Sequence, residues 1–417
     1  MKAHKALLIG IIATLAVLAG ALLLYTFVLS SPKLIIQSSP DNAEITFDNA
    51  VIHSHSITTT VGDHLVKLTA DGYVTYQKKI TLTRAQKLVL PVLMKNIPTP
   101  VVLSASVTNS PKLLDKSDVY FVGNLGHTLY RTQTVTGQTA VNVVALTPDS
   151  LTDISKVQMR PDGAVALMKK ADGVYLYDFA RHDLLNQTLT LWGTNIDDFA
   201  WSPSSIQAAY TYYGTNGEQT LILSDVQNAN LRRVYNLTID NIDHPTITWS
   251  PDGQQIFLKS NSTQTKTNYL YVYDIFAQKM TRLTTEGDVE GAKWSPNGQY
   301  VAYVAPGTTS SGGTSNLLWV AKSDGSGVIP LNVELSGVSK IAWVNSSKSI
   351  IAVTSSATGQ KLVNVTLDGT VTDYQYTKPS GIDFSPDNLI TIPNDDRVMF
   401  TVGNQLMSIS LTTPTYE

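Results

Sequence analysis

Hydrophobic and polar residues along most of this chain alternate in short runs, the pattern of antiparallel β-strands. The stretch "ITWSPDGQQIFLKS" (247–260) is typical, with an apolar run, a turn and a second apolar run. The runs are rich in β-branched and aromatic residues, and Gly, Pro, Asn and Asp separate them. No stripe with the period of a helix passes through them. We therefore predict a mainly β protein.

The first thirty residues follow a different pattern. Residues 6–29 are an uncharged apolar stretch of 24 residues, which as a helix would span about 36 Å and cross a hydrocarbon core of about 30 Å. Lys2 and Lys5 precede it and Lys33 follows, which favours a cytoplasmic N-terminus. A cleaved signal peptide is the alternative, although its apolar core usually runs about 7–15 residues. We expect residues 1–32 to be a cytoplasmic stub and a retained single-pass anchor in the cell membrane, with the bulk of the chain extracytoplasmic.

Residues 33–94 consist of short runs with a period of two, separated by turn formers, and predict a small antiparallel β-sandwich. The turn Pro40-Asp41-Asn42-Ala43, the Gly62-Asp63-His64 triplet before an alternating strand, and Gly72-Tyr73 resemble the PEGA domain. That resemblance implies an envelope-associated binding or spacer module without catalytic residues. The proline-containing stretch 95–102 is predicted to be a linker.

Residues 103–417 contain a repeat. The anchors of its units are Met159-Arg-Pro-Asp-Gly163, Trp201-Ser-Pro203, Trp249-Ser-Pro-Asp-Gly253, Trp294-Ser-Pro-Asn-Gly298, Trp343 and Phe384-Ser-Pro-Asp387, and a fainter unit begins at Asn109-Ser-Pro111. Successive anchors from Met159 onward are 42, 48, 45, 49 and 41 residues apart. A period of roughly 40–50 residues with several strands per unit is typical of β-propeller blades.

A second landmark repeats within the units. Runs such as "VYLYD" and "LILSD" end in an aspartate, at Asp178, Asp225, Asp274, Asp324 and Asp368. In four of the five units this aspartate follows its anchor by 24 to 30 residues. Each unit therefore reads as four strands in sequence, with the anchor at the end of the first.

The anchor turn has a structural explanation. Serine can bind the backbone through its hydroxyl, proline fixes φ, aspartate suits the third position, and glycine accepts a positive φ. The aromatic residue before the turn is expected to fill the wedge between neighbouring blades. We interpret these repeat residues as scaffold: Trp201, Pro203, Trp249, Pro251, Asp252, Gly253, Trp294, Pro296, Gly298, Phe384 and Pro386.

The anchors at Trp201, Trp249 and Trp294 resemble the TolB-like (WD-repeat-like) propeller motif, which also occurs in prolyl oligopeptidase-type enzymes. The resemblance covers roughly residues 101–417. Six clear units and the fainter one favour seven blades, and six remain an alternative. Because the last unit ends after its third strand, an N-terminal strand at about 101–107 is predicted to complete it and close the ring.

Composition limits the function. The chain has no cysteine, a net charge of −3 and 15% charged residues, so a thiol nucleophile and nucleic-acid binding are not expected. It also lacks the Gly-x-Ser-x-Gly pentapeptide of the serine hydrolases. The Gly-rich stretch 305–316 has neither the Gly-Lys-Ser/Thr ending of a phosphate loop nor a following helix, and is predicted to be a flexible insertion.

Few residues are candidates for chemistry. His53 and His55, on one face if that segment is a strand, form with nearby His64 a weak zinc candidate. His244 precedes an inner strand, on a face where propellers bind ligands. Paired carboxylates occur at Asp197-Asp198, at Glu286, Asp288 and Glu290, and at Asp395-Asp396, and solvated turns are the simpler explanation for them. No catalytic residue, resident metal or cofactor is assigned.

Two functions fit these patterns. The favoured one is a membrane-anchored extracytoplasmic binding or scaffold protein of the cell envelope, whose propeller presents loops to a protein or a cell-wall glycan. The alternative is an extracytoplasmic propeller enzyme, a lyase or hydrolase with acid and base residues at the mouth of the channel. A channel mouth lined by converging His, Asp or Glu around a pocket would favour the enzyme.

Overall fold

The structure is a computed structural model that describes residues 13–20, 31–114, 118–123, 128–133, 143–147, 153–180, 189–262, 268–285, 287–357, 359–379, 381–392, 397–411 and 415–416. Apart from the helical residues 13–20 and two short 3-10 helices, the regular structure of these segments is β-strand. Within them, no helix has the length and apolar character needed to span a membrane. Most of the predicted anchor at 6–29 lies outside the described residues.

The chain divides into two compact units, one formed by Met1–Pro98 with Thr412–Glu417 and the other by Thr99–Leu411. The first unit contains a β-sandwich. Its strands are β1 (Lys33–Ser39), β4 (Ser56–Thr58) and β7 (Lys87–Leu93) in one sheet, and β2 (Glu44–Phe47), β3 (Ala50–Ile52), β5 (Gly62–Thr69), β6 (Tyr76–Leu82) and β36 (Thr415–Tyr416) in the other.

Alternating side chains of the two sheets form the core of the sandwich. Along β1, exposed or half-buried positions alternate with buried ones, so Leu34 and Ile36 face Val66, Leu68 and other apolar residues of the second sheet.

The sequence placed the C-terminal residues in the propeller, but β36 pairs in parallel with the edge strand β6. An edge strand offers unpaired N–H and C=O groups to such an addition.

The second unit is a ring of seven four-stranded antiparallel sheets among the described residues. We number these blades 1 to 7 along the chain, beginning with the sheet that contains β9. From the inner strand outward, blade 1 consists of β9 (Lys112–Leu113), β10 (Asp118–Gly123), β11 (Thr128–Gln133) and β12 (Val143–Ala145), and blade 2 of β13 (Lys156–Met159), β14 (Val165–Lys170), β15 (Gly173–Asp178) and β16 (Thr190–Gly193). Blade 3 consists of β17 (Ile196–Trp201), β18 (Gln207–Tyr213), β19 (Gln219–Asp225) and β20 (Arg232–Asn236), blade 4 of β21 (Thr246–Trp249), β22 (Gln255–Lys259), β23 (Leu270–Asp274) and β24 (Lys279–Arg282), and blade 5 of β25 (Gly291–Trp294), β26 (Tyr300–Thr308), β27 (Thr314–Lys322) and β28 (Ile329–Glu334). Blade 6 consists of β29 (Ile341–Trp343), β30 (Ser349–Ser356), β31 (Gly359–Thr366) and β32 (Val371–Asp373), and blade 7 of β33 (Asp387–Thr391), β34 (Arg397–Val402), β35 (Gln405–Ser410) and β8 (Val101–Ser104). The 3-10 helices η3 (Leu237–Asp240) and η4 (Val338–Lys340) precede the inner strands of blades 4 and 6.

Blade 7 combines the two ends of the ring. Its outer strand β8 comes from the start of the unit and pairs antiparallel with β35 near the end. The sequence predicted this closure from the missing fourth strand of the last unit. Because β8 supplies that strand, seven blades are complete, and the alternative of six is wrong.

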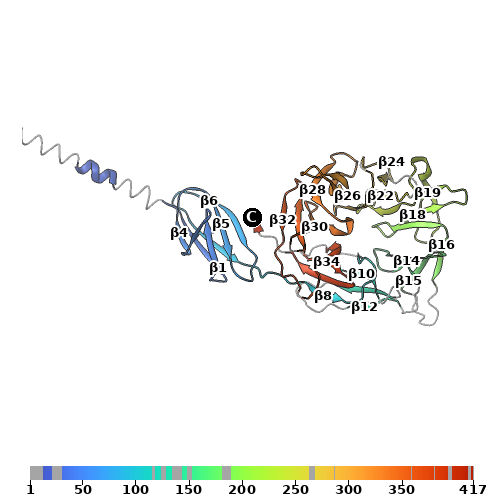
Figure 1. The fold of residues 1–417 in the computed structure, drawn as a ribbon, viewed down its shortest axis with the longest axis horizontal. Coiled ribbons are helices and arrows are strands. Elements are labelled where there is room, and N and C mark those ends of the chain that lie inside the picture. The colour runs from blue at the N-terminus through green and yellow to red at the C-terminus, as the bar shows by residue number, and fades with distance from the viewer. Residues whose placement is uncertain are drawn as a thin grey trace, which may run out of the picture. The chain divides into compact units, whose positions relative to one another are not determined.

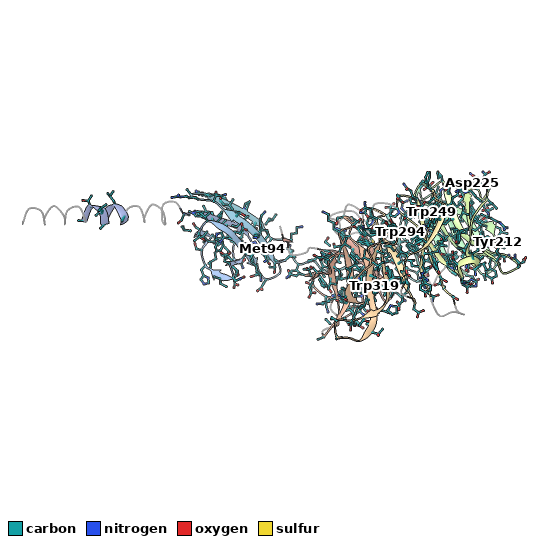
Figure 2. All side chains as sticks on the ribbon, turned by 90° about the horizontal axis from the view of Figure 1, so that it is seen from above. Met94, Tyr212, Asp225, Trp249, Trp294 and Trp319 are labelled. Carbon is teal, nitrogen blue, oxygen red and sulfur yellow. The ribbon has the colours of Figure 1, made fainter. Side chains whose placement is uncertain are left out.

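Neighbouring blades pack through hydrophobic clusters. Each of seven clusters within the described residues joins two consecutive blades, from 1 and 2 around to 7 and 1. In the last of them Phe121 of blade 1 meets Met399 and Leu406 of blade 7. Figure 1 shows the sheets following one another around the ring, and Figure 2 shows Trp249 and Trp294 within the packed side chains of this unit. The ring is thus closed by packing as well as by β8.

The turn after the inner strand has the same construction in several blades. In blade 4 the amide N–H of Gly253 donates to the carbonyl oxygen of Ser250 (2.9 Å), and the hydroxyl of Ser250 accepts from the N–H of Gln255 (2.9 Å). Gly253 has a φ of 72°, which glycine adopts without strain. Ser295 and Gly298 repeat the first of these bonds at 2.9 Å in blade 5. The Ser-Pro-Asp-Gly motif therefore builds a tight hairpin.

Phe384 and Pro386 do not occupy the equivalent place. The sequence put the last turn at Phe384-Ser-Pro-Asp387, but the inner strand β33 begins at Asp387 and continues to Thr391. Residues 393–396, between β33 and β34, lie outside the described segments. Phe384 packs between blades 6 and 7. The motif was misleading because a Ser-Pro-Asp triplet suits the turn before a strand as well as the turn after it.

The anchor tryptophans bind the preceding blade. The indole N–H of Trp249 donates to the carbonyl oxygen of Ala200 (3.0 Å), and that of Trp343 donates to the carbonyl oxygen of Lys293 (3.0 Å). The indole of Trp294 reaches the inner strand of blade 4 in the same way, at 3.4 Å. Each of these rings therefore fills the wedge between two blades and also joins their inner strands by a hydrogen bond.

Trp249→Phe is expected to cost about 1–2 kcal/mol more than Trp201→Phe. The first change leaves the buried carbonyl of Ala200 without its donor. The second removes an N–H that has no hydrogen-bond partner among the described residues. Loss of ring volume is common to both, so the difference isolates the hydrogen bond. Urea unfolding of the two variants measures it, and equal losses would contradict the assignment.

The Gly-rich stretch 305–316 is mostly strand, so the predicted flexible insertion is wrong. β26 and β27 run through it in register and leave only residues 309–313 for the turn. Gly307 is required by close packing, since a Cβ there would lie 2.8 Å from side-chain atoms of both Leu317 and Trp319. The indole of Trp319 also donates to Ala305 across the hairpin (3.1 Å). Gly307 therefore leaves room for the indole ring of Trp319.

Candidate functional site

Polar residues at or near the start of the inner strands meet across two blade junctions. In blades 2 and 3 these residues are Lys156 and Asp198, and the ammonium of Lys156 donates to the carboxylate of Asp198. In blades 1 and 7 they are Ser110 and Asn388, whose side chains are joined at 2.6 Å. Polar side chains near the start of the inner strands therefore join neighbouring blades at these two junctions.

Four lysines on or beside the inner strands cross to the next blade. Lys112 donates to the carbonyl oxygen of Val157 (3.2 Å) and Lys156 donates to that of Phe199 (3.1 Å). Lys293 and Lys340 make the same kind of bond, to Ile341 (2.6 Å) and Pro386 (2.7 Å) respectively. We call these four residues the staple lysines: Lys112, Lys156, Lys293 and Lys340.

Loss of solvation lowers the pKa of two of the staple lysines. It lowers the pKa of Lys112 to about 8, with a further contribution from the nearby ammonium of Lys156. It also lowers the pKa of Lys293 to about 8, against a partial opposing effect of the Asp387 carboxylate. Both ammonium groups therefore begin to lose their protons just above neutral pH.

Asp198 connects three blades. One carboxylate oxygen accepts from Lys156 of blade 2, and the other accepts from the backbone N–H of Ile247 in blade 4 (2.8 Å). The N–H of Asp198 itself donates to the hydroxyl of Thr211 (3.0 Å). Asp198 is 6% exposed, so these bonds replace the solvation that its charge has lost.

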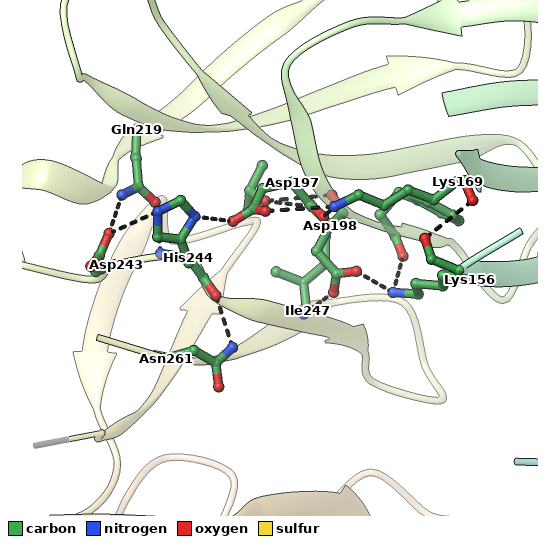
Figure 3. A network of polar contacts seen from close by, with 12 residues as sticks. Lys156, Lys169, Asp197, Asp198, Gln219, Asp243, His244, Ile247 and Asn261 are labelled. Atoms are coloured by element: carbon green, nitrogen blue, oxygen red, sulfur yellow. Dashed lines mark hydrogen bonds and ion pairs between the residues drawn. The ribbon is translucent and has the colours of Figure 1, made fainter. Parts of the chain in front are cut away.

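Asp197 points away from Asp198 and makes a different set of contacts. Its carboxylate lies 2.7 Å from Nδ1 of His244 and 3.6 Å from the ammonium of Lys169 (Figure 3). The register between β17 and β18 shifts between Ile196 and Asp198, so Asp197 is an extra residue without a partner in the ladder, and its carboxylate reaches different partners. His244 and Asp197 are 47 residues apart in the sequence.

His244 is held in place through both its backbone and its ring. Its backbone N–H donates to the side-chain oxygen of Gln219 (2.9 Å), and its carbonyl oxygen accepts from Asn261 (2.8 Å). The ring of Tyr213 stacks on the imidazole at 5.3 Å between centroids and 6° between planes. The backbone of His244 is left-handed, with φ of 42°. We call Asp197, Tyr213, Gln219, Asp243 and His244 the His244 cluster.

The His244 cluster has the parts of a proton-transfer pair. The carboxylate of Asp197 is hydrogen-bonded to Nδ1 of the imidazole. The other ring nitrogen, Nε2, lies 3.7 Å from the carboxylate of Asp243, beyond hydrogen-bonding distance. The side chain of His244 is 49% exposed, so solvent and solutes reach it. The same arrangement also suits recognition, because an aromatic plate and a fixed imidazole offer stacking and hydrogen bonding to a ligand.

Comparison with known families identifies the first unit. The PEGA domain family matches residues 31–96. Residues 31–96 are a PEGA domain. The match confirms the resemblance inferred from the turn at Pro40 and the Gly-Asp-His triplet. No curated protein matches the chain in sequence.

The propeller is similar to solved structures at low sequence identity. An oligogalacturonate lyase in complex with manganese is 12% identical, with a TM-score of 0.52 over 85% of this chain and 94% of that one. An oligogalacturonate lyase from Vibrio parahaemolyticus is 12% identical, with a TM-score of 0.50 over 93% of this chain and all of that one. At this identity the likeness concerns the fold alone.

The TolB resemblance is also found among solved structures. A putative TolB from Agrobacterium tumefaciens is 17% identical, with a TM-score of 0.40 over 65% of this chain and 94% of that one. The PEGA domain is followed by a β-propeller, as the repeat predicted. The number of blades and their closure rest on the sheets themselves.

The PEGA domain does not bring its three histidines together. His53 and His55 lie exposed in the segment between β3 and β4, so they do not share a strand face as expected. His64 is buried, and its ring nitrogens contact the carboxylate of Asp48 (2.7 Å) and the carbonyl oxygen of Thr60 (3.0 Å). Across the segments that the structure describes, no group of three His, Asp or Glu side chains is placed to hold a metal ion.

His64 should titrate above its ordinary pKa of 6.5. Burial lowers the pKa of His64, but the hydrogen bonds to Asp48 and Thr60 outweigh it and the net pKa is raised. The contribution of the protonated His64 to the stability of the domain is therefore complete below pH 6.5 and disappears as pH rises through the raised pKa. The His64 bond lowers the pKa of Asp48 from 3.8, and that contribution is lost as pH falls through the lowered value. NMR titration of the His64 ring measures this, and a His64 pKa at or below 6.5 would contradict it.

Of the other predicted carboxylates, the structure describes Asp288 and Glu290, and neither belongs to the His244 cluster. Glu286 and the pair Asp395-Asp396 lie outside the described residues. Glu290 accepts a hydrogen bond from the amide of Asn316 (2.6 Å), and Asp288 lies in a loop with φ of 58°. Asp197 and Asp198, by contrast, take part in the polar contacts between blades.

Proposed function

We propose that this chain is a membrane-anchored binding protein of the cell envelope, whose propeller presents the His244 cluster to a protein or a cell-wall glycan. The apolar stretch 6–29 supports the anchor, and the PEGA domain supports a spacer or adhesive role next to it. The closed ring supports rigidity. A rigid disc loses little conformational entropy when its loops bind a partner.

The observation that carries the binding proposal is the His244 cluster. Tyr213 and His244 form a half-exposed stacked pair held by Gln219, Asn261 and Asp197. A fixed aromatic surface with hydrogen-bonding groups suits the recognition of a sugar ring or a peptide side chain. Tyr213 is 38% exposed and the side chain of His244 is 49% exposed, so this surface is open to solvent.

Carbonate extraction of membranes tests the anchor. The full chain should stay in the membrane pellet, whereas residues 31–417 made without the apolar stretch should appear in the soluble fraction. Release of the full chain by carbonate would show that the stretch does not anchor it.

Cross-linking and affinity capture from envelope extract test the partner. The full chain should recover one stoichiometric partner or a defined glycan, and Tyr213→Ala and His244→Ala should each lower recovery at least about tenfold. Phe276→Ala is the matched control, because Phe276 is 96% exposed in the turn between β23 and β24 and belongs to no part of the cluster. Equal recovery by all variants would exclude this surface.

An extracytoplasmic enzyme is the second candidate, and the contact between His244 and Asp197 favours it. A lyase or hydrolase could use this imidazole as a general base with Asp197 orienting it. The two candidates differ in one experiment. Turnover of a polysaccharide panel by the full chain, abolished in His244→Ala, would establish the enzyme, whereas tight binding of an unchanged glycan would establish the binding protein.

A further inference from the structure

A cavity of about 220 Å³ lies between blades 1 and 2, at the start of their inner strands. Its polar wall includes Asn109, Lys112 and Lys156, and its apolar wall includes Tyr120, Val122 and Val157. The three residues of the apolar wall are buried. The cavity therefore combines cationic and amide groups with a hydrocarbon surface, and it shares no residue with the His244 cluster.

The charges around this cavity do not cancel. The ammonium of Lys156 is paired with the carboxylate of Asp198. Lys112 forms no ion pair with any carboxylate of the described residues, and its ammonium donates to the carbonyl oxygen of Val157 at 3.2 Å. An ammonium has three N–H groups, so two remain for another acceptor. The cavity thus carries one positive charge in excess.

The excess charge is energetically unfavourable where it lies. Burial, with the neighbouring Lys156, lowers the pKa of Lys112 to about 8. A negative group in the cavity would offset the lost solvation of this ammonium and would accept its two remaining N–H groups. Lys293 is a useful contrast, because it is half-buried and has the same pKa of about 8, but it donates to two carbonyl oxygens, at 2.6 and 3.1 Å, and does not line this cavity.

We propose that this cavity binds a small monocarboxylate. The carboxylate group lies against the ammonium of Lys112 and the amide of Asn109, and its short carbon chain lies against Tyr120, Val122 and Val157. The cavity has the volume of roughly seven water molecules, which fits an acid of a few carbon atoms. A single excess charge matches a monoanion better than the double charge of phosphate. The inference goes beyond the proposed function and does not rest on the anchor or on the His244 cluster.

Ligand binding to the full chain in detergent micelles tests this proposal. At pH 7, saturation-transfer NMR and calorimetry should show saturable binding of butyrate, at least about tenfold weaker binding of phosphate, and no binding of neutral butyramide. Lys112→Met should lower butyrate affinity at least about tenfold, whereas the matched control Lys293→Met should leave it unchanged. Absence of saturable butyrate binding, tighter binding of phosphate, or equal losses in the two variants would overturn the proposal.

The pH dependence of the unaltered chain gives a second test that needs no variant. Because only the protonated lysine attracts the carboxylate, a pKa of about 8 predicts that butyrate affinity falls about tenfold between pH 7 and pH 9. This result decides the question even if Lys112→Met fails to fold. Constant affinity over that range would exclude Lys112 as the binding group.

Discussion

Asp198→Ala is expected to destabilise the propeller by about 3–5 kcal/mol, the cost of leaving one member of a buried ion pair without its partner. The change removes the acceptor of Lys156 in blade 2 and the acceptor of the Ile247 N–H in blade 4 at once. The charge of Lys156, whose side chain is 27% exposed, then depends mainly on the carbonyl oxygen of Phe199. Urea unfolding of the propeller, followed by tryptophan fluorescence, measures the effect.

A matched control separates this role from a general effect of losing a carboxylate. Asp373 pairs with Lys361 through two contacts of 2.8 Å, but the side chain of Asp373 is 60% exposed. Asp373→Ala should therefore cost less than about 1 kcal/mol. Equal losses for Asp198→Ala and Asp373→Ala would show that Asp198 does not join the blades.

Removing both charges of the pair tests the mechanism. In the double variant Lys156→Met, Asp198→Leu no charge is left unpaired, so we expect it to recover at least about 2 kcal/mol relative to Asp198→Ala. The Ile247 N–H still lacks its acceptor in the double variant, so part of the lost stability is not recovered. A double variant less stable than Asp198→Ala would mean that the charges themselves hold the blades together.

The repeat predicted the ring well because each unit carries two landmarks with local causes. The turn at Ser250 to Gly253 needs a hydroxyl, a fixed φ and a positive φ, and each appears as a residue type in the sequence. The aspartate that ends the third strand likewise binds its own turn. Asp225 accepts from the backbone N–H groups of Gln227 (3.1 Å) and Ala229 (2.8 Å). Local hydrogen bonds leave a local signature.

The prediction was wrong where the same residues suit two places. The Ser-Pro-Asp triplet at Ser385 leads into β33, whose first residue is Asp387, rather than following that strand, although its spacing fitted the repeat. The pairing of Thr415–Tyr416 with β6 could not be seen either. Two residues carry no periodicity, and the edge that they cover belongs to the PEGA domain, more than three hundred positions earlier.

The candidate site was only partly visible in the sequence. Asp197, Asp198 and His244 stood out as residue types, but contacts across 47 and 49 residues depend on how blades 3 and 4 pack. A signal for the staple lysines was present and was missed. Lys156 and Lys340 occupy the position of Asp198, three residues before their anchors. A charged residue at a fixed position of the repeat is informative about contacts between blades, because residues at the same repeat position occupy equivalent places in their blades.

Deleting strand β8 is expected to open the ring. β8 is the outer strand of blade 7, and its pairing with β35 joins the two ends of the propeller. Without it, β35 becomes an exposed edge, and blade 7 loses its only link by strand pairing to the start of the unit within the described segments. Residues 105–411 should therefore unfold with at least about 3 kcal/mol less free energy than residues 99–411, and should aggregate more readily.

The comparison of these two fragments isolates the strand, because both lack the apolar stretch and the PEGA domain and differ only in residues 99–104. A synthetic peptide of residues 99–107 should restore stability to the shorter fragment by pairing with β35, and the same peptide with proline at Val102, which faces Met407 in the ladder, should not. Equal stability of the fragments would mean that the cluster around Phe121 and Met399 closes the ring without the strand. In that case packing rather than strand pairing would be the source of the rigidity on which the binding proposal depends.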